Sequence, residues 1–382
     1  MRQAMTHKRS EKAMERLREE VFAGMASKGV AGAAADEIWE KLQGFAHFGF
    51  PESHSVSFAY IVYMSAWLKY HWPAETLAGL LNAQPMGFYS PNSLVQDARR
   101  HGVEVLEPCI NRSFHDCTIE GGEADPDEIL SYYGAFWRKG RGALEDPIRP
   151  AVSVRLGLRY VRNLGVGEID RIEAARQLGG AFSGPEDLAY RTGLSIDSLE
   201  GLAAAGALSD LGVERRAGIW AAGALAEIGP ERLPLSPGVE APALFAMTSE
   251  ETHRADLWAT GISNTHPIQF IREDLKAAGC ITAMEALEMR KNGVAAEVGG
   301  VVTHRQKPGT AAGVIFYNLE DETGLLNVVV LPEIWNKYRE EARRYPAVVI
   351  GGRLEYKDGV TNLVAHRFRP LGVNALKSRD FR

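Results

Sequence analysis

The spacing of apolar residues changes near residue 290, and this change constrains the fold more than any other feature of the chain. Before it, apolar residues recur at helical spacing, whereas the last section holds short, valine-rich runs that are typical of β-strands. The predicted strands are Ala295–Thr303, Gly313–Leu319, Leu325–Leu331, Ala347–Tyr356 and Val360–Phe368. The chain is therefore expected to be mainly helical, with a β-rich domain in its last section.

The order of elements in that section favours one architecture. Pro332 begins a predicted helix through Arg344, placed between the third and fourth strands, and Lys357-Asp358-Gly359 forms a turn between the last two. Three strands, a helix and two more strands are the layout of a five-stranded OB barrel. The predicted fold class is thus multidomain: mainly α-helical regions followed by a C-terminal OB-fold.

Helical patterns dominate the earlier sections. Val56–Leu68 is apolar almost all round and is predicted to be a helix buried inside a larger body. It is too short to span a bilayer, which needs about 20 residues. Residues 118–150 are rich in glycine and proline and read as a connector, while the four prolines in residues 229–242 mark a linker.

A short glycine motif is the first candidate binding site. Val161–Gly167 reads VRNLGVG and precedes a predicted helix. A small-residue turn at a helix N-terminus leaves backbone N–H groups free to bind a phosphate, as in helix-hairpin-helix elements. The candidate DNA contacts are Arg162, Asn163, Gly165 and Gly167. The segment from Arg138 to Arg176 contains nine basic and five acidic residues, so it is locally positive, as phosphate contacts require. Ser198–Leu211 resembles a second, looser copy of the same hairpin.

The predicted barrel holds a second candidate site. A polar loop follows its first strand, and we expect His304, Arg305 and Lys307 to contact nucleic acid there. Phe316, Tyr317 and Arg353 are candidates to line a groove for single-stranded nucleic acid. The alternative is that Phe316 belongs to the core and that the basic loop is only solvated.

No catalytic or metal-binding set is predicted. Glu320-Asp321-Glu322 reads as a solvated turn, and no strand carries an aspartate pair of the kind that holds two metal ions. Cys109, Cys117 and Cys280 form no C-x-x-C pair, which favours reduced thiols over a zinc site. A DNA glycosylase, which also uses helix-hairpin-helix elements, is disfavoured because no lysine accompanies Glu168 and Asp170.

The charge balance excludes one class of protein. A net charge of -6 and a pI near 6.0 exclude a protein that coats DNA through general positive charge, but not one that binds through local basic patches. Residues 1–20 are charged throughout and show no signal peptide. We therefore expect a cytoplasmic protein.

Residues 44–55 read GFAHFGFPESHS, and residues 82–89 read NAQPMGFY. These segments, together with MTHKRS at 5–10 and SRDFR at 378–382, resemble the bacterial DNA polymerase III alpha subunit family in its error-prone branch. The resemblance implies an order of parts: later fingers at 1–110, a connector with a helix-hairpin-helix region at 111–228, a linker with helices at 229–290, an OB-fold at 291–372 and a tail at 373–382.

The resemblance also implies roles. Arg2, Lys8 and Arg9 match the fingers stretch near the incoming nucleotide triphosphate. The family's palm with its metal-binding aspartates, its thumb and its amino-terminal domain have no counterpart here, so no catalytic residue is assigned and this chain alone is expected to be inactive. The complete polymerase would use Mg²⁺, DNA and deoxynucleoside triphosphates. The sliding clamp or other mutagenesis proteins are further candidate partners, although Pro242–Phe245 lacks the glutamine of a clamp-binding peptide.

Two hypotheses follow. The first is the C-terminal part of an error-prone DNA-directed DNA polymerase for replication and damage-induced translesion repair synthesis, supplying DNA and nucleotide contacts. The second is a stand-alone nucleic-acid-binding accessory protein, with a helix-hairpin-helix region and an OB-fold but no catalysis. Palm aspartates encoded in frame upstream would favour the first.

Overall fold

The computed structural model describes residues 10–47, 52–87, 89–121, 152–229, 240–309, 311–373, 375 and 379–381, with side chains left out at 10–16, 43–47, 52 and 379–381. It divides the chain into two compact units, residues 1–68 and 69–382. Arg2, Lys8 and Arg9, the candidate nucleotide contacts, lie outside the described residues.

The first unit contains α2 (Ser10–Ser27), α3 (Ala33–His47) and most of α4 (Glu52–His71). Helices α2 and α3 pack around Trp39, whose ring lies 5.8 Å from that of Phe22, with Val21 and Leu42 beside it. The prediction that the apolar part of α4 is buried is wrong. Its large apolar side chains are exposed, from 43% at Leu68 to 72% at Tyr63, because no described segment covers them.

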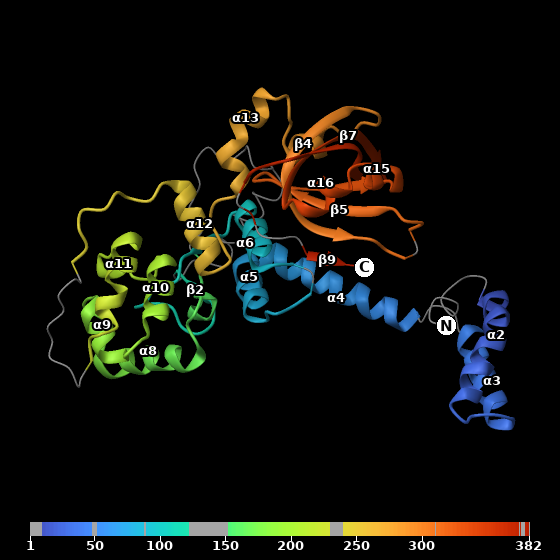
Figure 1. The fold of residues 1–382 in the computed structure, drawn as a ribbon, viewed down its shortest axis with the longest axis horizontal. Helices are drawn as coiled ribbons and strands as arrows, with labels where there is room; N and C mark the ends of the chain where they lie inside the picture. Colours follow the sequence, from blue (N-terminus) through green and yellow to red (C-terminus); the bar gives the residue numbers. More distant parts are fainter. Residues whose placement is uncertain are drawn as a thin grey trace. The chain divides into compact units, whose positions relative to one another are not determined.

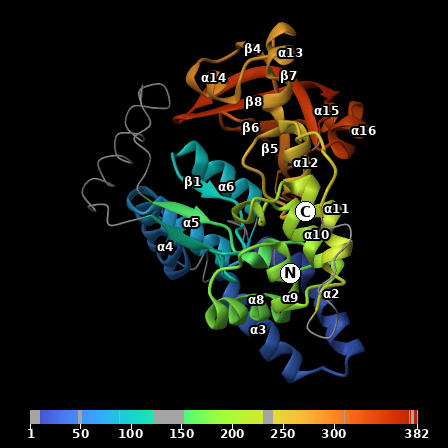
Figure 2. The ribbon, with the colours of Figure 1, turned by 90° about the vertical axis from the view of Figure 1, so that its left-hand side faces the viewer.

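The second unit begins with two helices on a small sheet. Helices α5 (Pro73–Asn82) and α6 (Pro91–Arg100) each start at a proline, and the Ser90 hydroxyl accepts the Ser93 N–H at the start of α6. The sheet has the order β1 (Glu104–Leu106), β3 (Ser153–Arg155), β2 (Thr118–Glu120), and β1 pairs with β3 in parallel. Figure 2 shows β1 beside α6.

A cluster of short helices follows, packed around leucine and alanine side chains. These elements are η1 (Leu158–Tyr160), α8 (Val166–Gly179), α9 (Pro185–Thr192), α10 (Ile196–Ala204), η2 (Ser209–Leu211) and α11 (Arg215–Leu225). Small residues let α10 and α11 pack closely. We call this group the helical cluster.

Helix α12 (Ser249–Ala259) lies between the helical cluster and α6 (Figure 1). A capping box between Thr248 and Glu251 fixes its start. The chain then runs through η3 (Pro267–Ile271), α13 (Arg272–Ala277) and α14 (Ala283–Glu288) into the β-rich section. Residues 253–272 thus connect the cluster with the sheet that follows.

The β-rich section is a closed barrel, which confirms the predicted OB-fold. Its strands are β4 (Ala295–Gln306), β5 (Ile315–Glu320), β6 (Leu325–Val330), β7 (Ala347–Lys357) and β8 (Val360–Pro370). They pair in the order β5-β6-β8-β7-β4, and β4 also pairs with β5, so the sheet closes on itself. The parallel β6–β8 pair and the helices between β6 and β7, α15 (Pro332–Lys337) and α16 (Arg339–Arg344), complete the OB layout.

A short further strand, β9 (Arg379–Phe381), pairs in parallel with the end of β4, where Arg379 lies opposite His304. The barrel interior is filled by aliphatic side chains and by Tyr317, which is 1% exposed and donates its hydroxyl hydrogen to the Ala342 carbonyl on α16. No helix in the described part of the chain is long and apolar enough to cross a membrane. The predicted domain boundaries stay predictions.

Candidate nucleic-acid interface

The structure forms the predicted hairpin between η1 and α8. Gly165 is the N-cap of α8, and its N–H donates to the carboxylate of Glu168, in the first turn of the helix, at 2.9 Å. This hydrogen bond stabilises the turn. Asn163 adopts a left-handed backbone with φ of 61°. Arg162, Asn163, Gly165, Val166 and Gly167 are all exposed, so the hairpin presents the free N-terminal end of α8 to solvent.

Helix α10 packs against the hairpin and stabilises it. The Ser198 hydroxyl donates to the Asn163 carbonyl at 2.9 Å and also lies 2.7 Å from a Glu168 carboxylate oxygen. Gly201 lets the two backbones meet, because a Cβ atom there would lie 2.2 Å from the Arg162 carbonyl oxygen. The exposed loop is therefore rigidly supported, as a phosphate-binding loop requires.

The second hairpin that the sequence suggested lies between α10 and α11. Gly206 and Gly212 have φ angles of 75° and 71°, which favour glycine and turn the chain from one helix to the other. Arg215, in the first turn of α11, pairs with Glu107 at 2.7 Å and with Asp256 at 2.6 Å. Its charge is used inside the protein, so this hairpin is less suited to phosphate binding than the first.

The barrel residues chosen from the sequence differ in position. Lys307 is exposed just beyond β4. His304 is 9% exposed, and its ring lies 5.3 Å from that of Tyr89. Arg305 is 7% exposed, donates to the carbonyls of Ala342 and Tyr345 and lies over Tyr317. Arg305 thus holds α16 on the barrel, and its predicted contact with nucleic acid stays a prediction.

The outer face of the barrel carries a band of side chains suited to a single strand. Phe316, Val329, Val364 and Arg353 lie opposite one another in register across β5, β6, β8 and β7. Phe316 is 40% exposed and Arg353 is exposed, whereas Tyr317 points into the core. The alternative that Phe316 is a core residue is therefore wrong, and so is the suggestion that Tyr317 lines the groove.

A second row runs beside the first and was missed in the sequence. Asn318, Asn327 and Asn362 lie opposite one another on β5, β6 and β8, all at least partly exposed. Amide side chains donate and accept hydrogen bonds, and the neighbouring phenyl ring and guanidinium add stacking and charge. The strand alternation could have placed these asparagines outside, but only the pairing order brings them together.

The acidic turn between β5 and β6 is buried, which contradicts its prediction as a solvated turn. Glu320 and Asp321 are 2% and 0% exposed. Arg100 of α6 donates to Glu320 at 2.6 Å, and Arg272 of α13 donates to Asp321 at 2.8 Å and to Glu322 at 2.6 Å. The prediction failed because both arginines come from distant parts of the chain.

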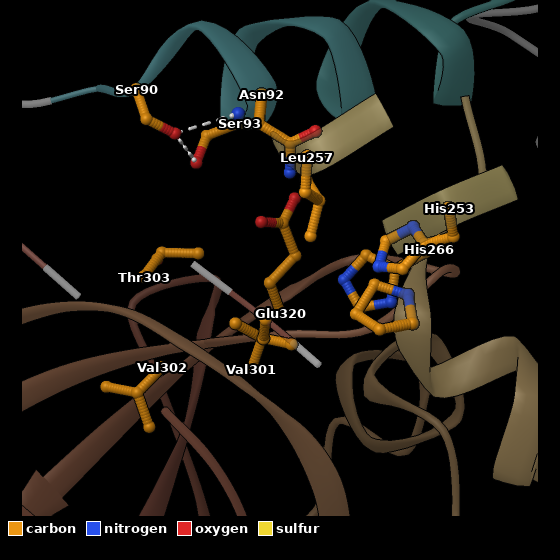
Figure 3. Close-up of a pocket in the computed structure, with 12 residues that line it drawn as sticks. Ser90, Asn92, Ser93, His253, Leu257, His266, Val301, Val302, Thr303 and Glu320 are labelled. Atoms are coloured by element: carbon orange, nitrogen blue, oxygen red, sulfur yellow. Dashed lines mark hydrogen bonds between the residues drawn. The ribbon is translucent and has the colours of Figure 1, made fainter. Parts of the chain in front are cut away.

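A small cavity of about 40 Å³ adjoins Glu320 (Figure 3). Figure 3 shows His253 and His266 side by side at one wall and the Glu320 side chain reaching toward Asn92 and Ser93 of α6. Burial raises the pKa of Glu320 to about 7, although Arg100 opposes the shift. Burial lowers the pKa of His266 to about 3, and nearby Arg100, His253 and Arg272 act in the same direction.

Within the described ranges no group of three or more histidine, cysteine, aspartate or glutamate side chains could hold a metal ion. The three carboxylates of the turn are used by arginines and by backbone N–H groups; Asp321 alone also accepts from Ala283, Thr323 and Gly324. This donor set does not fit a pair of catalytic ions. The exposed hairpin and the polar face of the barrel, by contrast, present groups that can bind a polyanion.

Comparisons with known proteins give two kinds of sequence match, to a motif family and to whole relatives. The helix-hairpin-helix motif family matches residues 102–218. Over the whole chain, the sequence is 45% identical to an error-prone DNA polymerase of Nocardia farcinica, 44% identical to one of Mycobacterium bovis and 40% identical to one of Corynebacterium jeikeium. The chain covers 32%, 33% and 36% of these relatives, so it spans about a third of their length.

Among the solved structures that align with part of the chain is a tRNA synthetase. Asparaginyl-tRNA synthetase from Pyrococcus horikoshii aligns with 26% of this chain and 24% of its own, at 17% identity and a TM-score of 0.21. This score is too low to establish a shared fold.

Proposed function

We propose that this chain, a homologue of error-prone DNA polymerases along its whole length, is the portion of such an enzyme that grips DNA. One observation carries the proposal most: an exposed hairpin at the N-terminus of α8, inside the region that the helix-hairpin-helix family matches. The enzyme would be a DNA-directed DNA polymerase acting in replication and in damage-induced translesion repair synthesis, in the bacterial cytoplasm.

In this proposal the hairpin contacts the backbone of duplex DNA. Exposed N–H groups at the start of α8 and the positive end of the helix dipole favour a phosphate oxygen. Arg162 and Asn163 lie directly before them and add a charge and an amide. Such contacts fix the position of the duplex and carry no sequence information, which suits an enzyme that must copy any template.

The barrel would bind the single-stranded template. Phe316 supplies a stacking surface, Arg353 a charge, and Asn318, Asn327 and Asn362 hydrogen bonds that tolerate different bases. Lys307, exposed beyond the end of β4, would extend this surface. His304 and Arg305 would support the surface from within the barrel, since both are buried.

Nucleotide addition itself would need residues beyond those described. Mg²⁺ in the complete polymerase would stabilise the charge that develops during attack of the primer 3′ oxygen on the incoming nucleotide. The described carboxylates do not form a site for it. We propose that Arg2, Lys8 and Arg9 lie near the nucleotide in the complete enzyme.

Contacts with protein partners form a further part of the proposal. In the segment between the helical cluster and α12, Leu244 and Phe245 are 43% and 91% exposed. Adjacent exposed apolar side chains on an extended segment suit docking into an apolar pocket of a partner protein. The sliding clamp and other mutagenesis proteins are the candidates, although the segment lacks the glutamine of a clamp-binding peptide. Loss of co-purification with a purified clamp by a Leu244→Ala, Phe245→Ala variant would support this contact, and an unchanged yield would contradict it.

The proposed grip is tested with fluorescent primer–template DNA and the whole chain. We expect measurable binding whose affinity falls steeply between 50 and 200 mM salt, because each phosphate contact releases counterions. We also expect no primer extension by the chain alone. A flat salt response would argue against a phosphate grip, and extension that is abolished by a chelator would contradict the assignment of catalysis to other residues.

A further inference from the structure

Trp258 lies against the hairpin although it is distant from it in sequence. It belongs to α12, well beyond residue 218 where the helix-hairpin-helix match ends. The Arg162 guanidinium carbon lies 4.8 Å from the centroid of the Trp258 ring, and the tryptophan is 44% exposed. The pair is therefore a surface feature beside the free end of α8.

The backbone is joined at the same place. The Arg162 N–H donates to the carbonyl of Ala259, the residue after Trp258, at 2.7 Å. Helix α12 also packs on α10, which supports the hairpin through Ser198 and Gly201. The indole and the base of the arginine side chain are thus fixed by one rigid assembly, and a shift of either would disturb both.

Stacking on Trp258 restricts the orientation of the Arg162 guanidinium. A free arginine side chain loses much rotational freedom when it contacts a phosphate, but a guanidinium already stacked on an indole keeps its N–H edges available in a defined direction. Among the residues that the structure describes, no carboxylate pairs with Arg162, whereas many other arginines of this chain form such pairs. Its charge is available for an external anion.

We propose that Trp258 is a positioning residue for the DNA contact of the hairpin, and that it acts by holding Arg162 toward a phosphodiester of the duplex. The inference rests on the proposed function, because it assumes that the hairpin binds DNA. It adds a residue that neither the glycine motif nor the matched family region contains. Trp258 does not itself contact the nucleic acid in this arrangement.

The test measures binding of the whole chain to a labelled 20-base-pair duplex by fluorescence anisotropy over a series of salt concentrations. Arg162→Ala should lower the slope of log affinity against log salt by about one, the loss of one phosphate contact. Trp258→Ala should weaken binding about two- to fivefold, and Trp258→Phe should retain most of the affinity because a phenyl ring also stacks. The double variant should bind no more weakly than Arg162→Ala.

Trp220→Ala serves as the matched control, since Trp220 is another exposed tryptophan, 58% exposed on α11. It should bind as the unaltered chain does, and thermal midpoints should show that all variants fold. Equal weakening by Trp258→Ala with and without Arg162 would reveal a general structural effect and overturn the inference. If Arg162→Ala weakens binding and Trp258→Ala does not, the inference fails while the proposed function stands; if the unaltered chain does not bind, the proposed function fails.

Discussion

At the level of single residues, the chain places ionisable side chains in its interior and neutralises them with partners from other elements. Glu320 and Arg100 lie 220 residues apart in sequence and meet at 2.6 Å. Burying an isolated charge is strongly unfavourable, so each such group depends on its partner or on its proton. This dependence makes the pairs sensitive both to substitution and to pH.

Glu320 and His266 should make opposite contributions to the pH dependence of stability. The pKa of Glu320 is raised from 4.5 to about 7, so its contribution is complete below pH 4.5 and is lost as pH rises through 7. The pKa of His266 is lowered from 6.5 to about 3, so its contribution is present above pH 6.5 and is lost as pH falls toward 3. Between pH 4.5 and 6.5 the two trends should largely cancel.

Single variants should separate the pH dependence of Glu320 from that of His266 when the free energy of unfolding is measured in urea at several pH values. The free energy of unfolding of Glu320→Gln, minus that of the unaltered chain, should rise by up to about 1.4 kcal/mol per pH unit between pH 4.5 and 7. The same difference for His266→Asn should fall with rising pH between 4.5 and 6.5. Differences that do not change with pH would show that neither group titrates as its surroundings imply.

Removing Arg272 should be far more damaging than removing an exposed lysine nearby. Arg272→Ala leaves Asp321, which is fully buried, without its cationic partner, and we expect a loss of about 3–5 kcal/mol in the free energy of unfolding. Lys276→Ala breaks the exposed pair with Glu273 and should cost less than about 1 kcal/mol. Similar midpoints for the two variants in denaturant titrations would contradict a structural role for the buried pair.

Whether a site residue could be predicted from the sequence depended on how far apart the interacting residues lie along the chain. The exposed hairpin residues follow one another along the chain, so their pattern was visible in Val161–Gly167. Trp258 and the pairs of the acidic turn gave no local signal, because their partners are set by tertiary packing. The Asn318–Asn327–Asn362 row depends on the exact register of the parallel β6–β8 pair, which the spacing of the predicted strands does not give.

At the level of elements, the contact between α10 and the first hairpin depends on the absence of a side chain at Gly201. A Cβ atom there would lie 2.2 Å from the Arg162 carbonyl oxygen, so Gly201→Ala must displace the hairpin. In α11 a Cβ at Gly223 would meet only the end of Ile196, at 3.6 Å. Although both are helical glycines, alanine should destabilise the protein at 201 and stabilise it by up to about 1 kcal/mol at 223.

The measurement is again denaturant unfolding, joined with DNA binding for both variants. Gly201→Ala should weaken DNA binding along with stability, and Gly223→Ala should leave binding unchanged. A Gly201→Ala variant as stable as Gly223→Ala would mean that the two backbones are not in close contact.

Helix α4 should exchange its amide hydrogens faster than the barrel strands. Its apolar side chains are exposed over most of its length, whereas the strands are hydrogen-bonded on both sides around a buried core. Local opening is easiest where few apolar contacts are lost. Hydrogen–deuterium exchange read by mass spectrometry would check this, and equal protection in Glu52–His71 and Ala347–Lys357 would contradict it.

Helices and strands were predictable where one period ran for several turns or one alternation for several residues. The barrel strands and α4 lie where the sequence predicted them. The predicted burial of α4 was wrong, because burial depends on which other segments surround a helix. The short strands β1, β2 and β3 are only three residues each, too short to show alternation. Their existence depends on the pairing of segments far apart in the chain.

At the level of the whole molecule, residues 253–272 connect the helical cluster, α6 and the barrel by buried polar contacts. Asp256 accepts from Arg215 of α11 and from Ser263, while the Ser263 carbonyl accepts from Gln96 of α6. Arg272 then reaches the acidic turn of the barrel. Since these contacts are shared among the parts, the second unit should unfold cooperatively.

Asp256→Ala should uncouple these parts. It removes the carboxylate that accepts from both Arg215 and Ser263 and so breaks the buried link between α11 and the segment before the barrel. Arg215 keeps its pair with Glu107. Calorimetry should then show two separate unfolding transitions for the second unit in place of one. Arg216→Ala, which breaks a more exposed pair with Glu251, is the control and should keep a single transition. A single, merely lowered transition in Asp256→Ala would indicate that apolar packing alone maintains the coupling.

The pairing of Arg100 with Glu320 also limits how related chains can diverge. The buried polar atoms of each side chain need the other as a hydrogen-bond partner, so a lineage that loses one residue faces selection to lose or replace the other. Positions 100 and 320 should therefore vary together across descendants of a common ancestor, passing from an ionic to a neutral pair in linked steps. Natural sequences that keep one of the two residues opposite an apolar residue would indicate that the barrel contacts α6 through other side chains.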